Sequence, residues 1–455
     1  MRPALRLVLE RISRVLPGIF CQVCRWTSSS VQNVLSSPLG LPPGVLALRP
    51  RHRQTWQRIP RGVLLRCALA AGLCLPAMAL TSSPRDFLFF DLPPRILNHL
   101  LPGELLVSEE GVHFARLPEE RVEEWSHRIH TEMGGCGGFI DVTRETQAGA
   151  LPEGVVLREV LRRHLAPYSA PIRLKLKPEI SGLVEAASGT ALWGFLDELS
   201  SFPDRSATTE NGARAAEFLK NKALSLGTEL ARFHVWTVAT GGGLYARQPS
   251  VVATYPGTDP SAPGIVIGAH MDTYSTAKPG ADDDGSGSAT VLEVLRAIAE
   301  SRSTFRSTIH FVWYSAEERG LVGSGYVVPE FAKQGLKVKA ALQLDMVGWD
   351  SPADAHDLYL ITDYTDPQLT AALRTLVETF TDAKVGETRC GYPCSDHVNW
   401  HRAGIPVVFP FESSFENMNN RLHTGEDKLA FLAQAHALRF AKAALAFAGE
   451  MAELE

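Results

Sequence analysis

No uninterrupted apolar run in this sequence approaches the ~20 residues that a membrane-spanning helix requires, so we expect no membrane span. Lysine is missing from residues 1–66, which carry eleven Arg against a single acid, Glu10. The rest of the chain holds 34 basic and 49 acidic residues, a net charge of 34 − 49 = −15. Because phosphate binding needs a basic surface, this acidic body argues against nucleic acid as a partner.

Cysteine is also scarce, with 7 in 455 residues, and four of these precede residue 75. The remaining three are Cys136, Cys390 and Cys394. The last two enclose a C-x3-C loop, which in an oxidising compartment closes most simply as a disulfide. A structural zinc site is the alternative, but it needs two further ligands and the sequence has no second cysteine pair.

Residues 58–79 have the three-part layout of a secretory signal peptide. Three Arg form a basic flank, residues 67–75 are apolar, and Ala77 and Ala79 take the small-residue positions before a cleavage site. A short buried helix is the alternative. The layout predicts secretion, to the extracellular space or the periplasm. We interpret residues 1–57 as an extension upstream of the true start codon, or less readily as an organelle transit peptide.

Two further segments follow the signal. Residues 80–170 contain short strand-like and helix-like patterns separated by Pro and Gly, and we interpret them as a propeptide. Residues 166–178 are rich in Pro and Lys, a composition typical of an exposed connector that is open to proteolysis. We expect a catalytic domain over residues 175–455, which is about the maximum for a single core.

Strands alternate with helices in the expected catalytic domain. Continuous apolar or β-rich runs predict strands over residues 264–269, 308–314 and 338–344. Helical spacing is found in residues 288–298, and a helix is expected from Leu321 onward. This alternation predicts an α/β fold with a mixed, mostly parallel sheet between two layers of helices. Ligand sites in such sheets lie at the carboxyl ends of the strands.

Side chains typical of a two-zinc hydrolase lie in five short segments, most of them just after a predicted strand. Zinc pairs are bound by imidazoles and carboxylates, with one carboxylate shared and coordination left open for water and substrate. Adjacent buried carboxylates such as Glu317 and Glu318 repel each other unless a cation neutralises them. A solvated helix N-terminus remains an alternative explanation for Asp282 and Asp284. The five segments are His270-Met271-Asp272, Asp282-Asp283-Asp284, Glu317-Glu318, Asp345 and His423.

The motifs GAHMD, PGADDDGSG, AEERGLVGS, LQLDM, CGYPCSDH and RLHT resemble those of the bacterial secreted di-zinc leucyl aminopeptidases, of the aminopeptidase Y superfamily. The resemblance covers residues ~180 to ~450 and implies two zinc ions. Asp283 would bridge them, His270 and Asp345 would complete one site, and Glu318 and His423 the other. It also suggests a cis peptide bond between Asp283 and Asp284.

The resemblance further implies a division of labour around the metals. Glu317 would be the general base. One zinc ion would polarise the scissile carbonyl oxygen, and the other would hold the free α-amine of a peptide substrate. Asp272 is expected to accept the second ring N–H of His270. Tyr392 is a candidate donor to the tetrahedral oxyanion, and Ser395 is expected to hydrogen-bond near Glu317. The region around GGCGGF is similar to the propeptides of these enzymes, and Cys136 within it is a candidate zinc-binding plug.

Substrate choice would rest on an apolar pocket with the Cys390–Cys394 bridge in its wall. Such an apolar pocket favours Leu, Met and Phe side chains of the substrate over charged ones. Close relatives often carry Tyr where this chain has Met418, so the rim of the pocket differs. By resemblance the pocket is lined by Met346, Ile361, Phe409, Phe411, Phe415, Met418 and Leu422.

Three rival functions share parts of this pattern. A single-zinc glutaminyl cyclase is one rival, but this chain has every ligand for a second metal ion, which such an enzyme does not need. A carboxypeptidase would need a basic anchor, for which Arg319 and Arg421 are candidates. A binding ectodomain without metals would have no need of the ligands. We expect a monomer that acts on peptide N-termini and binds its own propeptide. The other twelve of the 14 histidines, His130 among them, are expected to be ordinary surface or core residues, with His397 the one candidate for a site role.

Overall fold

The fold is taken from a computed structural model of the chain. It describes residues 84–109, 111–133, 138–149, 171–226, 233–241, 243–274 and 279–455. The predicted upstream extension and signal peptide lie outside the described residues, and so does Cys136. No helix in the described part of the chain has the length and apolar character that a membrane crossing requires.

A six-stranded mixed sheet, in the order β12-β9-β7-β8-β6-β5, forms the centre of the molecule. The pairings from β12 to β8 are parallel, and β6 joins β8 and β5 in antiparallel register. The parallel strands are continuous apolar runs because both of their faces are covered. The strand bounds are β5 His234–Val238, β6 Ser250–Tyr255, β7 Gly264–His270, β8 Ile309–Tyr314, β9 Val338–Gln343 and β12 Val407–Val408.

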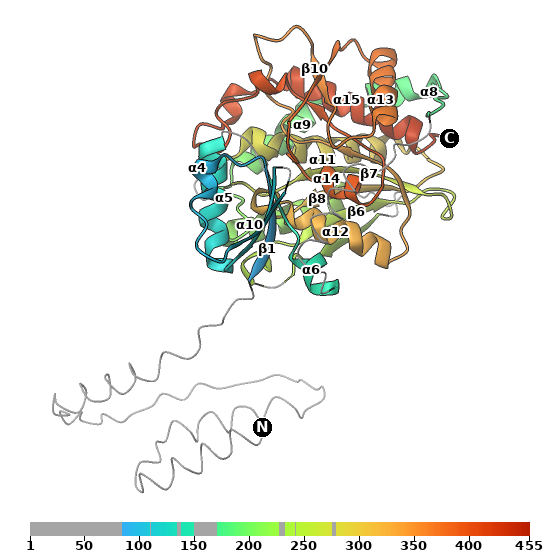
Figure 1. Cartoon of the computed structure of the whole chain (residues 1–455). Helices are drawn as coiled ribbons and strands as arrows, with labels where there is room; N and C mark the ends of the chain where they lie inside the picture. The colour runs from blue at the N-terminus through green and yellow to red at the C-terminus, as the bar shows by residue number, and fades with distance from the viewer. Residues whose placement is uncertain are drawn as a thin grey trace, which may run out of the picture. The chain divides into compact units, whose positions relative to one another are not determined.

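Helices cover both faces of this sheet (Figure 1). Ile265 and Ile267 of β7 face one core, which includes side chains of six helices. Val266, between them, faces the other core, formed with α12 (Val322–Lys333) and α14 (His397–Arg402). The predicted three-layer α/β/α fold and its strands and helices are therefore confirmed. The six helices of the first core are α8 Glu179–Glu185, α9 Gly189–Ser200, α10 Glu210–Leu226, α11 Gly287–Ser301, α13 Pro367–Phe380 and α15 Gln434–Met451.

A smaller sheet, β11-β10-β13, extends from the main body near α13. Its strands are β11 Val385–Thr388, β10 Leu358–Ile361 and β13 Pro410–Phe411. The structure describes residues 171–178 of the predicted connector. They pack against the domain, so the expectation of an exposed connector is wrong for their apolar side chains. Ile172, Leu174 and Leu176 pack against the main core, and the Glu450 carboxylate accepts the backbone N–H of Leu176 at 2.9 Å.

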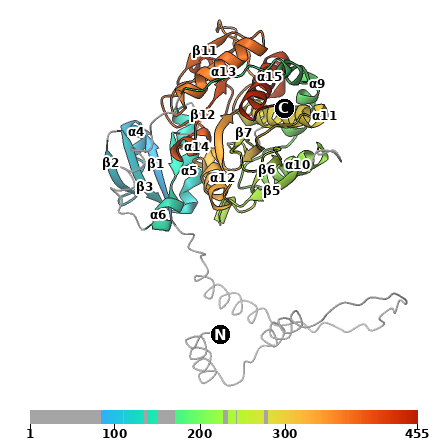
Figure 2. The same cartoon turned by 90° about the vertical axis from the view of Figure 1, so that its right-hand side faces the viewer.

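The N-terminal segment, defined here as the described residues between 84 and 149, has an antiparallel sheet of its own, in the order β2-β3-β1-β4. Figure 2 shows this sheet and α5 beside α12 and α14. Phe89 and Trp125 of the segment share an apolar cluster with Ala316 and Val322, and residues 80–455 form one compact unit. The elements are β1 Arg85–Phe90, α4 Pro94–Leu97, β2 Leu105–Glu109, β3 Val112–Leu117, α5 Glu119–Met133, β4 Phe139–Asp141 and α6 Thr143–Gly149.

Candidate metal centre

The carboxyl ends of three adjacent parallel strands bring the predicted ligands together. His270 is the last residue of β7, Asp345 follows β9, and the Glu317-Glu318 pair follows β8. His423 reaches the same point from a loop near the C-terminus. All five predicted ligand side chains are at most 6% exposed. The sheet edge and this loop thus bring together residues that lie up to 153 positions apart in the sequence, as expected for an open α/β sheet.

Two groups of side chains meet at Asp283. In the first, His270 Nε2 lies 3.1 Å from Asp283 Oδ1 and 3.5 Å from Asp345 Oδ1. In the second, His423 Nε2 lies 2.9 Å from Asp283 Oδ2 and 3.4 Å from Glu318 Oε2. Asp283 therefore presents one carboxylate oxygen to each group.

These spacings fit a pair of zinc ions. A tetrahedral zinc ion with bonds of ~2.0 Å separates its neighbouring ligand atoms by about 3.3 Å. The ligand atoms of the first group lie within 4.8 Å of one another, and imidazole nitrogens with carboxylate oxygens are the ligands that zinc prefers. Without cations, so many buried carboxylates at one point would be strongly unfavourable.

Main-chain carbonyl groups and carboxylates fix the orientation of the first group. The Nδ1–H of His270 points to the main-chain oxygen of Asp272 at 3.1 Å, which leaves Nε2 to face the carboxylates. The prediction gave this contact to the Asp272 carboxylate, whose Oδ1 is 3.7 Å away. That carboxylate instead accepts the backbone N–H of Glu317 at 2.9 Å and of Glu318 at 3.4 Å.

The loop of three acids is buried, which corrects the alternative of a solvated helix N-terminus for Asp282 and Asp284. Both side chains are 0% exposed. Asp284 accepts backbone N–H groups from His270, Gly287 and Met346, so that one carboxylate ties together three of the site's segments. The Asp283–Asp284 peptide bond is cis, as the resemblance suggested.

Further partners of this loop were missed from the sequence. The Asp427 carboxylate accepts the backbone N–H of Asp282 at 2.9 Å and of Asp283 at 3.1 Å. The buried guanidinium of Arg205 donates to the main-chain oxygens of Met271, Pro279 and Gly280. Asp427 lies four residues after His423 and could have been suspected from that spacing, whereas Arg205 has no local signal.

Glu317 differs from its neighbour Glu318 in its ion pairs: Glu318 Oε2 lies 3.4 Å from His423 Nε2, whereas Glu317 forms no ion pair with a described residue. Both of its carboxylate oxygens are buried and accept no hydrogen bond from any described residue. Burial raises the pKa of Glu317 well above its usual range, and Glu318 and Asp396 add to this shift while His270 opposes it. Burial likewise raises the pKa of Asp396 to about 8. Glu317 is thus a carboxyl group with high proton affinity and no hydrogen-bond partner in the part of the chain that the structure describes.

Ser395 and Tyr392 lie near the cluster in different ways. Ser395 was expected near Glu317, but its hydroxyl donates to Asp345 Oδ2 at 2.6 Å. It accepts from Gln343 Nε2 at 3.1 Å, so it orients the carboxylate of the expected ligand Asp345. Tyr392 lines the adjoining pocket together with Asp345.

An apolar pocket opens beside Asp345, and the predicted disulfide between Cys390 and Cys394 is present in its wall. The rings of Phe409, Phe411 and Phe415 follow one another at 5.8 Å. All seven predicted pocket residues belong to one apolar cluster with the two cysteines and Tyr392. Ile361 and Leu422 belong to the cluster but do not line the pocket. The other five line it directly: Met346, Phe409, Phe411, Phe415 and Met418.

The two basic residues considered as carboxylate anchors have other partners. Arg319 is buried and binds the Glu123 carboxylate through Nε at 2.8 Å and Nη2 at 2.9 Å. Arg421 lies over the rings of Trp349 and Phe431. These contacts give no support to a carboxypeptidase.

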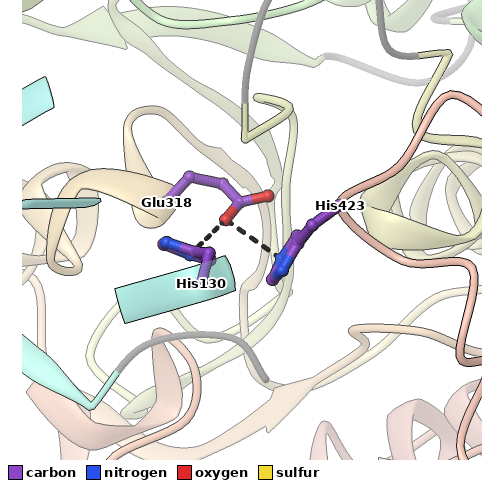
Figure 3. A group of neighbouring side chains, drawn as sticks. All are labelled: His130, Glu318 and His423. Atoms are coloured by element: carbon purple, nitrogen blue, oxygen red, sulfur yellow. Dashed lines mark ion pairs between the residues drawn. The ribbon is translucent and has the colours of Figure 1, made fainter. Parts of the chain in front are cut away.

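His130 is a further residue of the site that the sequence did not indicate. It lies on α5 of the N-terminal segment, is 2% exposed, and places Nε2 at 2.8 Å from Glu318 Oε2 (Figure 3). Its ring centroid is 4.4 Å from that of His423. His130, Glu318 and His423 form a group that could hold a metal ion. By contrast, the structure gives the buried His397 an apolar neighbour, Phe409, at 5.0 Å between rings.

Comparisons with known proteins agree with this geometry. The chain matches Peptidase family M28 over residues 250–448. It is 36% identical over 354 residues to leucine aminopeptidase 1 of Penicillium rubens. This match covers 72% of this chain and 86% of the relative. Leucine aminopeptidase 1 of Phaeosphaeria nodorum is 31% identical over 415 residues, covering 86% of this chain and 97% of the relative.

Two solved structures from Legionella pneumophila are also similar. The LapA aminopeptidase has a TM-score of 0.72 at 34% identity, with 82% of this chain and 99% of that chain covered. LapB has a TM-score of 0.73 at 30% identity, with coverages of 82% and 100%. The relatives are thus fungal as well as bacterial, and the match is not to a bacterial group alone.

Proposed function

The chain belongs to peptidase family M28 and is a metallo-aminopeptidase, and from this premise we propose a two-zinc enzyme that releases large apolar residues from peptide N-termini. The observation that carries the proposal is the position of Asp283 between two histidines. Its Oδ1 lies 3.1 Å from His270 Nε2, and its Oδ2 lies 2.9 Å from His423 Nε2. A carboxylate held in this way is suited to bridging two cations.

Each zinc ion would have one imidazole and one carboxylate of its own in addition to Asp283. His270 and Asp345 would hold the first, and Glu318 and His423 the second. When bound, the pair would supply Lewis acidity, which polarises a carbonyl group and makes water more acidic. The backbone N–H groups of Asp283 and His270 donate to the carboxylates of Asp427 and Asp284, and these hydrogen bonds support the roles because they fix the shared loop and the end of β7.

Glu317 would act as the general base. Its carboxylate would take a proton from the attacking water and deliver it to the nitrogen of the leaving amine. The support is its position next to a ligand, its lack of a hydrogen-bond partner among the described residues, and its raised pKa, which results from burial. The backbone N–H of Glu317 is held by Asp272, so the main chain is fixed while the carboxylate is available.

Two features favour the N-terminal residue of a peptide as the substrate. Neither of the two openings beside the cluster is lined by Lys or Arg among the described residues, and both contain ligand carboxylates. A cationic α-amine is attracted to such a site, whereas a C-terminal carboxylate is repelled. The pocket of Met346, Phe409 and Phe411 would then receive a Leu-like side chain.

Secretion and processing are part of the proposal. The signal-like residues 58–79 and the Cys390–Cys394 disulfide both suit an exported enzyme. Residues 80–170 would act as a propeptide, bound to the site until they are removed, and the mature enzyme would act as a monomer.

The experiment is an assay of the purified protein on Leu-, Arg- and pyroglutamyl-amide substrates, with metal analysis, before and after chelation. We expect two zinc ions per chain, a preference for Leu, and loss of activity on chelation that zinc restores. A single zinc ion at full activity would refute the bridged pair and favour a cyclase.

A further inference from the structure

The N-terminal segment contacts the turn that carries Glu317 and Glu318 at several points. Ser126 Oγ donates to the main-chain oxygen of Glu318 at 2.7 Å, and the backbone N–H of Asp141 donates to that of Gly320 at 2.8 Å. Gly320 has a φ of +98°, and an added Cβ would lie 3.0 Å from the Phe139 ring. Together with the Glu123–Arg319 ion pair, these contacts hold α5 over the second metal group in a defined position.

His130 is oriented by its own helix in the same way as the expected ligand His270. Its Nδ1 lies 2.5 Å from the main-chain oxygen of Ser126, one turn earlier in α5. A carbonyl oxygen only accepts, so Nδ1 carries the proton, and in the neutral ring Nε2 has a free electron pair. This electron pair faces Glu318 Oε2 at 2.8 Å, which is also an acceptor. Two acceptors at this distance require a cation or a second proton between them.

We propose that His130 is a fourth protein ligand of the metal ion that Asp283, Glu318 and His423 hold. The inference rests on the proposed two-metal function and identifies how the same site is regulated. Structural zinc sites have four protein ligands, whereas catalytic sites have three and leave a position open. With His130 bound, the second site is closed to the substrate amine. When the N-terminal segment leaves, three ligands remain and the position opens.

Adjacent side chains support this role. Tyr274 packs its ring 4.7 Å from that of His130 and 5.1 Å from that of His423, so the imidazoles are enclosed in an aromatic wall. The same tyrosine hydroxyl contacts His127 on α5. Removal of α5 would therefore open a ligand position and also uncover Tyr274 and Glu318 on one side of the cluster.

The rival explanation is a charged His130 that forms an ion pair with Glu318 and binds no metal. The two explanations differ in the number of imidazoles bound to metal in the uncleaved chain. The full chain is loaded with cobalt(II), and its hyperfine-shifted imidazole N–H signals are counted by NMR. We expect three, from His270, His423 and His130. Two signals would overturn the proposal. This count uses the unaltered protein, so it does not depend on how a variant folds.

Substitution gives a second, independent readout. In full-length His130→Ala, we expect a chelator to extract one metal ion about 10- to 100-fold faster than from the unaltered chain, since a ligand is lost. His127→Ala is the matched control, because His127 lies on the same helix and contacts Tyr274 but belongs to neither metal group. Equal extraction rates for His130→Ala and the unaltered chain would overturn the proposal.

Activity separates this inference from the proposed function. Full-length His130→Ala is expected to hydrolyse Leu-amide faster than the unaltered full chain without being cleaved. If three imidazoles are bound but neither this variant nor the processed enzyme cleaves Leu-amide, the proposed function fails and the ligand assignment stands. If the processed enzyme is active and only two imidazoles are bound in the full chain, the ligand assignment fails and the function stands.

Discussion

The carboxylate of Asp272 accepts the backbone N–H of Glu317 at 2.9 Å, so a residue two positions after the expected ligand His270 holds the main chain of the expected general base. The same carboxylate also contacts the backbone N–H of Glu318 at 3.4 Å. Asp272 therefore connects the end of β7 to the turn after β8. It belongs to neither group of expected metal ligands, which makes it a positioning residue.

Asp272→Asn is expected to lower kcat about 10- to 100-fold, as changes in the groups behind metal ligands usually do. The amide keeps one acceptor oxygen, but its NH₂ group opposes the second backbone N–H, so the Glu317-Glu318 turn shifts. KM for Leu-amide and the zinc content should change little. Metal analysis beside steady-state kinetics checks this, and loss of a zinc ion would show that Asp272 acts on the ligands directly.

Glu317→Gln should lower kcat by about 10²–10⁴, the usual contribution of general base catalysis. The amide has nearly the same size but cannot accept the proton, so both zinc ions and KM should be retained. Glu318→Gln is the matched comparison because it changes the adjacent residue, which we expect to be a ligand. This second variant should lose metal as well as rate. If both variants retain two zinc ions, or if Glu317→Gln loses one, the two roles have been assigned wrongly.

The sequence predicted the sheet and the clustering of the expected ligands because both follow from local patterns. Buried parallel strands are short apolar runs, and their carboxyl ends share an edge, so His270, Glu318 and Asp345 could be expected together. The α/β fold of the expected catalytic domain and the Cys390–Cys394 disulfide were predicted correctly because they too follow from local patterns. The pocket residues came only from resemblance, since Phe409 or Met418 alone cannot be told from core residues.

Contacts between distant segments could not be predicted. His130 is one of several polar residues on an amphipathic helix, and nothing near it in the sequence indicates that its ring meets Glu318 and His423. Similarly, Asp272 two residues after His270 suggested a carboxylate that accepts the ring N–H. The sequence cannot show which oxygen of Asp272 accepts the ring N–H of His270. In the structure it is the main-chain oxygen and not the carboxylate.

Pocket selectivity can be tested at Phe415, whose ring lies 5.8 Å from Phe411 and 5.9 Å from Tyr392. Phe415→Ala removes apolar surface that would contact a large substrate side chain. We expect kcat/KM for Leu-amide to fall about 10- to 100-fold and that for Ala-amide to fall less. Phe431→Ala is the control, because Phe431 is exposed and does not line the pocket. Equal losses for both substrates would place Phe415 outside the specificity pocket.

Stability at acid pH should depend on His310, which is buried on β8. Burial lowers its pKa from the ordinary 6.5 to about 4. Between these values the unfolded chain binds a proton that the folded chain does not, so stability present above pH 6.5 is lost as the pH falls towards 4. The full loss is about 3 kcal/mol.

His310→Gln removes this titration, so its Tm should fall less than that of the unaltered protein between pH 6.5 and 4. The exposed His234, changed to Gln, is the control and should leave the pH dependence as it was. Parallel Tm curves for His310→Gln and the unaltered protein would contradict the role of His310.

Cleavage between residues 150 and 170 should not by itself activate the enzyme. The contacts of the N-terminal segment with residues 318–320 are made by residues 123–141 and are not covalent bonds, so a cut further along the chain leaves them intact. We expect activity on Leu-amide to rise only when the segment dissociates. Limited proteolysis followed by size-exclusion chromatography, with activity measured before and after separation, tests this. Full activity in the nicked, still associated complex would show that the N-terminal segment does not block the site.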